Sequence, residues 1–153
     1  MLRFLCDEML ISLGKWLRIA GYDTAILDPK TSDQEILQLA IKENRFLITR
    51  DRHFLQMKDP EKLVLFLSSN SLDECAVELK QRVHLNWLYQ PFTRCLQCNS
   101  SLIETNDQAL WERVPPDVVQ SSNLWYCPQC DKIYWIGSHT DKMFKQLTFW
   151  HNN

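Results

Sequence analysis

Four of the six cysteines form two Cys-x-x-Cys pairs, Cys95-Leu96-Gln97-Cys98 and Cys127-Pro128-Gln129-Cys130. The 28 residues between the pairs (99–126), in a chain without a recognisable secretion signal, indicate a metal site; redox dithiols are the alternative. Each tight turn lets two thiolates reach one ion, and two turns supply the four ligands that Zn²⁺ favours. Because protein fills all four positions, we predict one structural zinc ion bound by Cys95, Cys98, Cys127 and Cys130.

Three aspartates stand where a parallel sheet would bring them together. Asp7 follows the apolar run 2–6, Asp51 comes after the run 46–49, and Asp33 opens a later helix. Residues beyond the carboxyl ends of parallel strands line one crevice, and a helix N-terminus at that edge faces it. We therefore expect the three carboxylates to converge, with Glu8 as a fourth candidate.

Clustered carboxylates repel one another, so protons or divalent cations must neutralise them. Oxygen ligands suit Mg²⁺ or Mn²⁺, which retain waters and bind phosphate oxygens. Such an ion can bind a phosphodiester, activate a water and stabilise the leaving oxygen. Each aspartate also has a structural alternative. Asp7 can cap a helix, Asp33 can interact with a helix dipole, and Asp51 can start a turn.

The chain as a whole is not basic, since its net charge is −2. Residues 1–90 contain 12 basic and 13 acidic residues, and residues 91–153 contain 5 and 6. Nucleic-acid binding must therefore depend on a local patch or on metal ions. The candidate phosphate contacts are Lys15, Arg18, Arg50, Arg52 and His139. For each of them, an ordinary solvated side chain is the alternative.

The first 85 residues alternate between short apolar runs and amphipathic segments. Strands are predicted at 2–6, 24–27, 46–49 and 63–67, and helices at 9–20, 33–44 and 72–83. Gly21 stands where the first helix needs a C-terminal cap, and Ser32 with Glu35 forms a capping box for the second. This alternation predicts an α/β fold with a parallel sheet flanked by helices.

The pattern changes at Pro91, where cysteines, turn residues and scattered aromatic rings replace the alternation. We therefore predict an α/β domain over residues 1–90 and a small zinc-ribbon domain over residues 91–153. So short a segment buries little surface, and the ion should supply much of its folding free energy. The aromatic rings of the ribbon can stack on bases, but we favour a role in its core and its contact with the first domain.

Some classes of protein are excluded by what the sequence lacks. Three glycines are too few for a glycine-rich phosphate loop. No apolar run reaches the roughly 18–20 residues of a membrane helix, and the first residues lack the features of a signal peptide. We therefore expect a cytoplasmic protein that makes no contact with a membrane.

Several blocks of the chain, taken in order, resemble the PIN-like ribonuclease family with a C-terminal zinc ribbon. This family occurs as stand-alone prokaryotic proteins and at the C-terminus of mutator-type exonucleases. In the first part the blocks are 4–10 (FLCDEML), 13–24 (LGKWLRIAGYDT), 32–37 (SDQEIL) and 47–51 (LITRD). In the second part they are 92–99 (FTRCLQCN) and 134–139 (YWIGSH). The resemblance covers nearly the whole chain, and the order and combination of the blocks make it specific.

The resemblance implies a PIN-like fold and a metal-dependent ribonuclease that hydrolyses RNA phosphodiester bonds with Mg²⁺ or Mn²⁺. Asp7 and Asp51 would bind the catalytic ion, and Asp33 or Glu8 would complete its shell or orient the water. Arg18, Arg50 and Arg52 would contact phosphates. Asp73 is the candidate for the fourth acid that PIN nucleases usually carry late in the domain.

Two other functions stay open at this point. One is a non-catalytic RNA-binding module with a vestigial acidic pocket, which would bind RNA without cleaving it. The other is a protein–protein adapter built on the zinc ribbon, which would lose its partner when Trp135 or Trp150 is changed. The sequence does not specify the RNA target, the oligomeric state, or whether cleavage is endonucleolytic or exonucleolytic.

Overall fold

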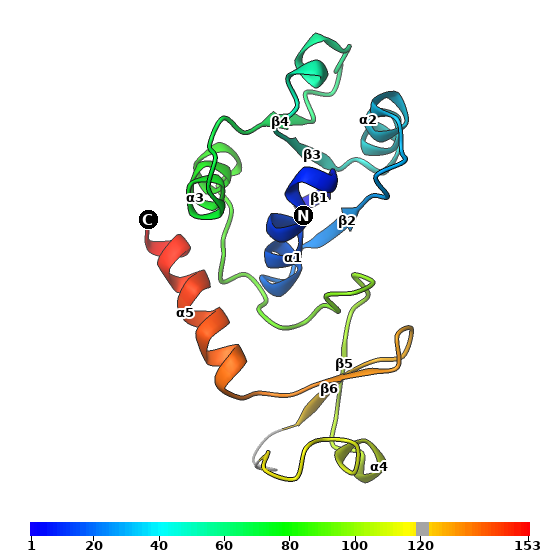
Figure 1. The fold of residues 1–153 in the computed structure, drawn as a ribbon, viewed down its shortest axis with the longest axis vertical. Helices are drawn as coiled ribbons and strands as arrows, with labels where there is room; N and C mark the ends of the chain where they lie inside the picture. The colour runs from blue at the N-terminus through cyan, green and yellow to red at the C-terminus, as the bar shows by residue number, and fades with distance from the viewer. Residues whose placement is uncertain (119–122) are drawn as a thin grey trace.

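The computed structural model describes residues 1–118 and 123–153. A four-stranded parallel sheet with its helices forms the upper part of Figure 1, and a three-stranded antiparallel sheet lies in the lower part. This confirms the predicted fold class, a parallel α/β sheet flanked by helices, with a small second sheet and the cysteine cluster later in the chain. Within the described residues, no helix has both the length and the apolar character needed to cross a membrane.

The four strands of the parallel sheet lie within one residue of their predicted bounds. They are β1 (Arg3–Cys6), β2 (Asp23–Ile26), β3 (Phe46–Thr49) and β4 (Val64–Phe66), in the order β2-β1-β3-β4. Side chains of β1 alternate between two hydrophobic clusters. Phe4 and Cys6 join one cluster and Leu5 joins the other. Burial on both faces explains why the strands of a parallel sheet are apolar runs.

The helices also follow the sequence pattern, with one difference. They are α1 (Ile11–Ile19), α2 (Asp33–Glu43) and α3 (Leu72–Val83). The predicted first helix is interrupted, because Asp7 caps a short 3₁₀ turn, η1 (Glu8–Leu10), and α1 begins only after it. The predicted capping box is present, with Ser32 and Glu35 exchanging hydrogen bonds. Gly21 has φ of +99°, the conformation that favours glycine after a helix.

Helices cover both faces of the parallel sheet. On one face α2 and the 3₁₀ turn η2 (Arg52–Gln56) pack around Leu5 and Leu47. On the other face α1 and α3 are joined by α5 (Ser138–Asn152), which returns from the lower part of Figure 1. Trp150 of α5 is fully buried, and its ring packs edge-on against Trp16 at 4.9 Å between centroids. The last helix of the chain therefore belongs to the core of the α/β part.

The ribbon is built on a second, antiparallel sheet. Its strands are β5 (Ile103–Thr105), β6 (Leu124–Cys127) and β7 (Lys132–Tyr134), in that order, and a short helix α4 (Gln108–Trp111) precedes β6. Trp111, Val114 and Leu124 form its small core, a role that we expected for aromatic residues of this segment. The predicted domain boundary at residue 90 stays a prediction. Helix α5 lies after this boundary in the sequence, but it packs in the core of the α/β part.

Asp23 joins the amino-terminal edge of the sheet to the ribbon. Its carboxylate accepts hydrogen bonds from Arg45 Nη1 at 2.8 Å, Arg3 Nε at 3.2 Å and Asn99 Nδ2 at 2.7 Å. Burial alone would raise the pKa of Asp23, but these hydrogen bonds and the charge of Arg45 lower it from 3.8 to about 2.

We predict that acid weakens the fold partly through Asp23. Because its pKa is lower in the folded chain, the carboxylate stabilises the fold above about pH 4, and this contribution is lost as the pH falls towards 2. Asp23→Asn should therefore lower the free energy of unfolding in urea near neutral pH, and less so in acid. Asp117→Asn, at an exposed position of the ribbon, is the matched control. A native chain and an Asp23→Asn chain with parallel pH profiles would contradict this account.

Candidate active site and candidate metal centre

Two of the predicted aspartates lie where the connections of the sheet diverge. The chain leaves β1 through α1 on one face and enters β3, the neighbour of β1, through α2 on the other. In open α/β sheets, ligands bind at the carboxyl ends of the strands at such a switch point. Asp7 follows β1 directly and Asp51 lies two residues beyond β3. The structure therefore places both at one edge, as the sequence predicted.

Thr49, the last residue of β3, connects these two aspartates. Its hydroxyl donates to Asp7 Oδ2 at 2.9 Å and accepts from the backbone N–H of Asp51 at 3.0 Å. Thr49 is fully buried and Asp7 is 6% exposed. The sequence analysis missed Thr49, although a polar residue at the end of an apolar strand was a signal available to it.

The surroundings of Asp7 favour a nearby cation. Burial raises the pKa of its carboxyl above 3.8, and the negative charges of Asp51 and Glu8 act in the same direction. Hydrogen bonds from the Thr49 hydroxyl and from the Met9 N–H act in the opposite direction. A bound cation would supply the favourable interaction that burial has taken from this carboxylate.

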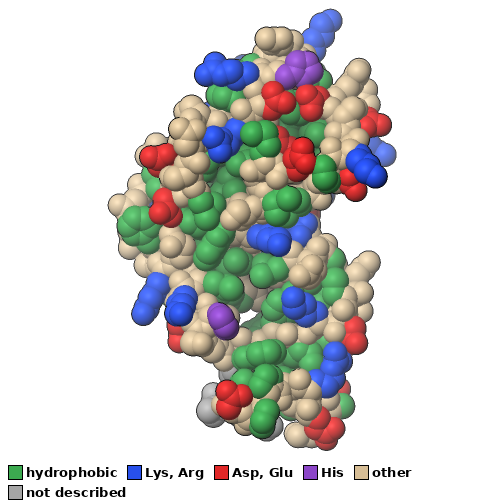
Figure 2. Space-filling model, viewed as in Figure 1, with side chains coloured by type: hydrophobic (Ala, Val, Ile, Leu, Met, Phe, Trp, Pro, Cys, Tyr) green, Lys and Arg blue, Asp and Glu red, His purple; other side chains and the backbone are tan. Residues whose placement is uncertain are grey.

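His53 connects Asp33 to the other two aspartates. Its Nδ1 lies 2.7 Å from Asp33 Oδ2, and its backbone N–H donates to Asp51 Oδ1 at 2.9 Å. A continuous series of hydrogen bonds thus runs from Asp7 through Thr49, Asp51 and His53 to Asp33. Figure 2 shows acidic side chains beside a histidine near the top of the α/β part. His53 was also missed by the sequence analysis, although it lies two residues after Asp51.

The three aspartates do not form a single coordination shell as their side chains stand. Among described residues, one set of three or more Cys, His, Asp or Glu side chains has ligand atoms within 4.8 Å of one another, and it is the cysteine cluster. Asp33 instead hydrogen-bonds to His53. The expected convergence of all three carboxylates is therefore incomplete. Glu8 is exposed, next to Asp7 at the start of η1.

The structural alternatives for the aspartates are also realised. Asp7 Oδ1 accepts a hydrogen bond from the N–H of Met9 and caps η1, and Asp51 Oδ1 caps η2 through His53. Asp33 lies in the first turn of α2. Both oxygens of Asp7 already accept a hydrogen bond, whereas no described residue donates one to Asp51 Oδ2, so Asp51 keeps an oxygen free for a cation. Capping and metal binding are therefore compatible in the same side chain.

The predicted phosphate contacts lie in different environments. Lys15 is exposed on α1, and Arg52 is exposed with its guanidinium carbon 5.6 Å from the centroid of the Phe66 ring. Arg50 is half-buried and donates from Nη2 to Asn70 Oδ1 at 2.8 Å. Arg50 and Arg52 flank Asp51 and so lie at the carboxyl edge of the sheet.

Arg18 lies at the junction of the two parts of the molecule. It is 6% exposed, and its guanidinium donates from Nε to the Thr24 carbonyl at 2.9 Å and from Nη1 to the Leu96 carbonyl at 2.8 Å. Its hydrogen bonds tie α1 to β2 and to the first cysteine turn. We therefore assign Arg18 to this junction and do not include it among the phosphate contacts proposed below.

Asp73 also has structural partners. Its Oδ1 accepts hydrogen bonds from Trp150 Nε1 at 2.8 Å and from Gln146 Nε2 at 3.1 Å. The carboxylate thereby joins α3 to α5. These contacts do not support Asp73 as a fourth acid of the site.

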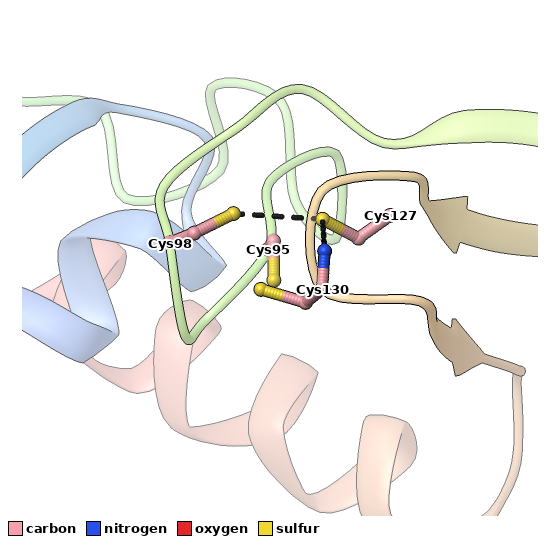
Figure 3. A group of neighbouring side chains, drawn as sticks. All are labelled: Cys95, Cys98, Cys127 and Cys130. Carbon is pink, nitrogen blue, oxygen red and sulfur yellow. Dashed lines mark hydrogen bonds between the residues drawn. The ribbon is translucent and has the colours of Figure 1, made fainter.

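The four cysteines lie close enough together to bind a structural zinc ion. Figure 3 shows their side chains converging from two turns, with 3.5 Å between the sulfurs of Cys98 and Cys127. A Zn–S length of about 2.3 Å implies about 3.8 Å between sulfurs of a regular tetrahedron, so the spacing fits. A hydrogen bond with Ser100 lowers the pKa of Cys98 to about 6, whereas hydrogen bonds with the neighbouring sulfurs raise the pKa of Cys130 to about 12, so the full set of four thiolates requires a cation between them.

Comparison with known families identifies the class of protein. Residues 2–147 match the Mut7-C RNAse domain, so the chain belongs to this family, in agreement with the resemblance found in the sequence. Comparisons with curated proteins and with solved structures gave no match. Membership of this family suggests a ribonuclease-type function.

We predict that Thr49→Val destabilises the fold by about 1–3 kcal/mol, because it removes the hydrogen-bond partner of Asp7 Oδ2 and of the Asp51 N–H. Urea unfolding measures the loss. The matched control is Thr148→Val on α5, where the hydroxyl donates only to its own helix. The pKa of Asp7, followed by NMR, should rise further because a hydrogen bond that lowers it is removed. An unchanged Asp7 pKa would show that the hydroxyl does not stabilise this carboxylate.

We predict that the chain binds one zinc ion and that Cys98→Ser releases it. Because Arg18 and Asn99 connect the first cysteine turn to β2, the loss should also speed amide hydrogen exchange at Thr24, whose N–H donates to Asn99 Oδ1. Elemental analysis and exchange mass spectrometry measure the two effects. Cys75→Ala, a buried cysteine outside the cluster, is the control and should keep the zinc. Faster exchange confined to the ribbon would disprove the coupling.

Proposed function

We propose that this chain is a metal-dependent ribonuclease that hydrolyses RNA phosphodiester bonds at the carboxyl ends of β1 and β3. The observation that carries the proposal is the pairing of Asp7 and Asp51 through Thr49 at the switch point of the sheet. Membership of an RNAse domain family supports it independently. The cysteine cluster, with four protein ligands and no position for substrate, fits a structural zinc ion better than a reactive centre.

Asp7 and Asp51 are the residues that would hold Mg²⁺ or Mn²⁺. Mg²⁺ usually takes one or two carboxylates and keeps several waters, so a pair of aspartates at an open edge suits it. Asp7 is buried near the negative charges of Asp51 and Glu8, and Asp51 Oδ2 accepts no hydrogen bond from a described residue. When bound, the ion would polarise a phosphoryl oxygen and make a bound water more acidic.

The remaining residues position the reactants. Thr49 connects Asp7 to the backbone of Asp51 through its hydroxyl. His53 makes a hydrogen bond with Asp33 in the first turn of α2. Asp33 would orient the attacking water and accept its proton, as Glu8 could from the other side. The water oxygen would then bond to phosphorus while the bond to the leaving sugar oxygen breaks, and that oxygen would take a proton from solvent. Arg50 and Arg52 would contact the phosphates that flank the cleaved bond, and exposed Lys15 a more distant one.

We predict that Asp51→Asn and Asp7→Asn each reduce Mn²⁺-dependent cleavage of single-stranded RNA by at least about a hundredfold, because each removes a charged ligand of the ion. Cleavage of an end-labelled oligonucleotide measures this. Asp117→Asn, at an exposed position of the ribbon, is the matched control and should cleave like the native chain.

Two details decide whether this experiment is clean. The divalent ion should be withheld and added back rather than removed with a strong chelator, since a chelator can also strip zinc from the cysteines. The proposal fails if Asp51→Asn cleaves as well as the native chain. Binding of RNA by a native chain that never cleaves it would instead indicate a non-catalytic RNA-binding module.

A further inference from the structure

A cavity of about 300 Å³ lies where the antiparallel sheet meets the end of α1 and the beginning of α5. Four of its lining residues are the aromatic residues Phe92, Trp125, Tyr134 and Trp135. Three others are Arg94, Lys132 and His139, and none of the described lining residues is Asp or Glu. Figure 2 shows hydrophobic and basic side chains around the narrow region between the upper and lower parts of the molecule. The cavity thus combines flat apolar walls with positive charge.

These cations are not neutralised by carboxylates. Arg94 donates from Nε to the Gly21 carbonyl at 3.1 Å and from Nη1 to the Asn99 carbonyl at 2.9 Å, so its hydrogen-bond partners are carbonyl oxygens and not carboxylates. Lys132 Nζ lies 5.4 Å from the centroid of the Tyr134 ring. No ion pair among described residues involves Arg94, Lys132 or His139. Lys132 and His139 are therefore available to bind a negatively charged ligand.

We propose that this cavity binds one nucleotide of single-stranded RNA, with its base against the aromatic rings and its phosphate near Lys132 and His139. Aromatic rings stack on any base, and cations select a ligand that carries phosphate over an uncharged aromatic side chain of a protein partner. The volume is at the lower end of the range for ligand sites, which suits a single base. The assignment rests on the proposed ribonuclease function, because that function makes RNA the ligand.

The cavity and the proposed active site lie at opposite ends of α1. Asp7 precedes η1 and α1, whereas Ile19, the last residue of α1, lines the cavity. The nine residues of α1 span about 14 Å. A dinucleotide has a single phosphodiester bond, so with that bond at the active site it cannot also fill the cavity at the far end of α1, but a longer strand can. The cavity would therefore bind a nucleotide that lies some distance along the strand from the cleaved bond. It would contribute to the binding of long substrates but not of dinucleotides.

Lys132 is the most informative residue to change. Arg18 and Arg94 both lie against the first cysteine turn, where they offset the net charge of −2 that Zn²⁺ and four thiolates would carry. Lys132 is exposed on β7, and no ion pair among the described residues involves its side chain, so its charge is available to a phosphate. Because Lys132 pairs with Cys127 in the β6–β7 ladder, elemental analysis should verify that its variant keeps the zinc. Lys145, exposed on α5 and outside the lining of the cavity, provides a matched control for overall charge.

The experiment compares Lys132→Glu with Lys145→Glu. Affinity for a 12-nucleotide single-stranded RNA is measured by fluorescence anisotropy without Mg²⁺ or Mn²⁺, and cleavage of a dinucleotide is measured with Mn²⁺. We expect Lys132→Glu to weaken RNA binding by about tenfold and Lys145→Glu by less than about twofold. Dinucleotide cleavage should be the same in both variants and the native chain. His139→Ala should weaken binding in the same direction, and circular dichroism verifies that each variant is folded.

The outcomes separate this inference from the proposed function. Equal weakening by both charge reversals, or unchanged RNA binding by Lys132→Glu, overturns the nucleotide site and leaves cleavage at Asp7 and Asp51 unaffected. Lys132-dependent RNA binding by a native chain that does not cleave RNA supports the nucleotide site while the proposed ribonuclease function fails. Quenching of 2-aminopurine in the RNA, present in the native chain and lost in Lys132→Glu, supports stacking on the rings.

Discussion

The burial of the last three residues of β1 is the constraint on which the rest of the structure depends. Phe4, Leu5 and Cys6 are all inaccessible to solvent, and they face two different hydrophobic clusters. No charged group can lie inside such a strand without a partner, so the first acid of the chain appears where the strand ends. Asp7 is still largely buried there, and the Thr49 hydroxyl satisfies it. The pairing of β1 with β3 then places Asp51 beside it.

Local features of the structure could be predicted from the sequence, and long-range ones could not. The strand bounds, the capping box of Ser32 and Glu35 and the cap at Gly21 follow from patterns a few residues long. The contact between His53 and Asp33 depends on how η2 packs beside α2, which no local pattern encodes. The same limit applies to Arg18, because its partners are carbonyls on β2 and on a distant turn. A buried arginine and an exposed one look alike in sequence.

The two edges of the parallel sheet have different roles. At the carboxyl edge, Asp7, Asp51 and Asp33 are linked by hydrogen bonds through Thr49 and His53. No arginine or lysine forms an ion pair with these aspartates among the described residues. At the amino-terminal edge, Asp23 is fully matched by Arg3, Arg45 and Asn99, and the ribbon docks. Negative charge is therefore compensated where the structure is held together and uncompensated where the proposed chemistry takes place. Helix α1 spans the distance between the two edges.

The return of α5 to the α/β part makes the ribbon, in topological terms, an insertion. The rings of Trp16 and Trp150 are in contact although 134 positions separate them in sequence. The ring of Trp87 also packs against that of Trp150. Contacts this distant form late, because closing such a long loop costs more entropy than forming local structure. On the ribosome, the core of the α/β part therefore stays incomplete until Trp150 has been synthesised. All residues of the antiparallel sheet are therefore synthesised before the first half of the chain can complete its own core.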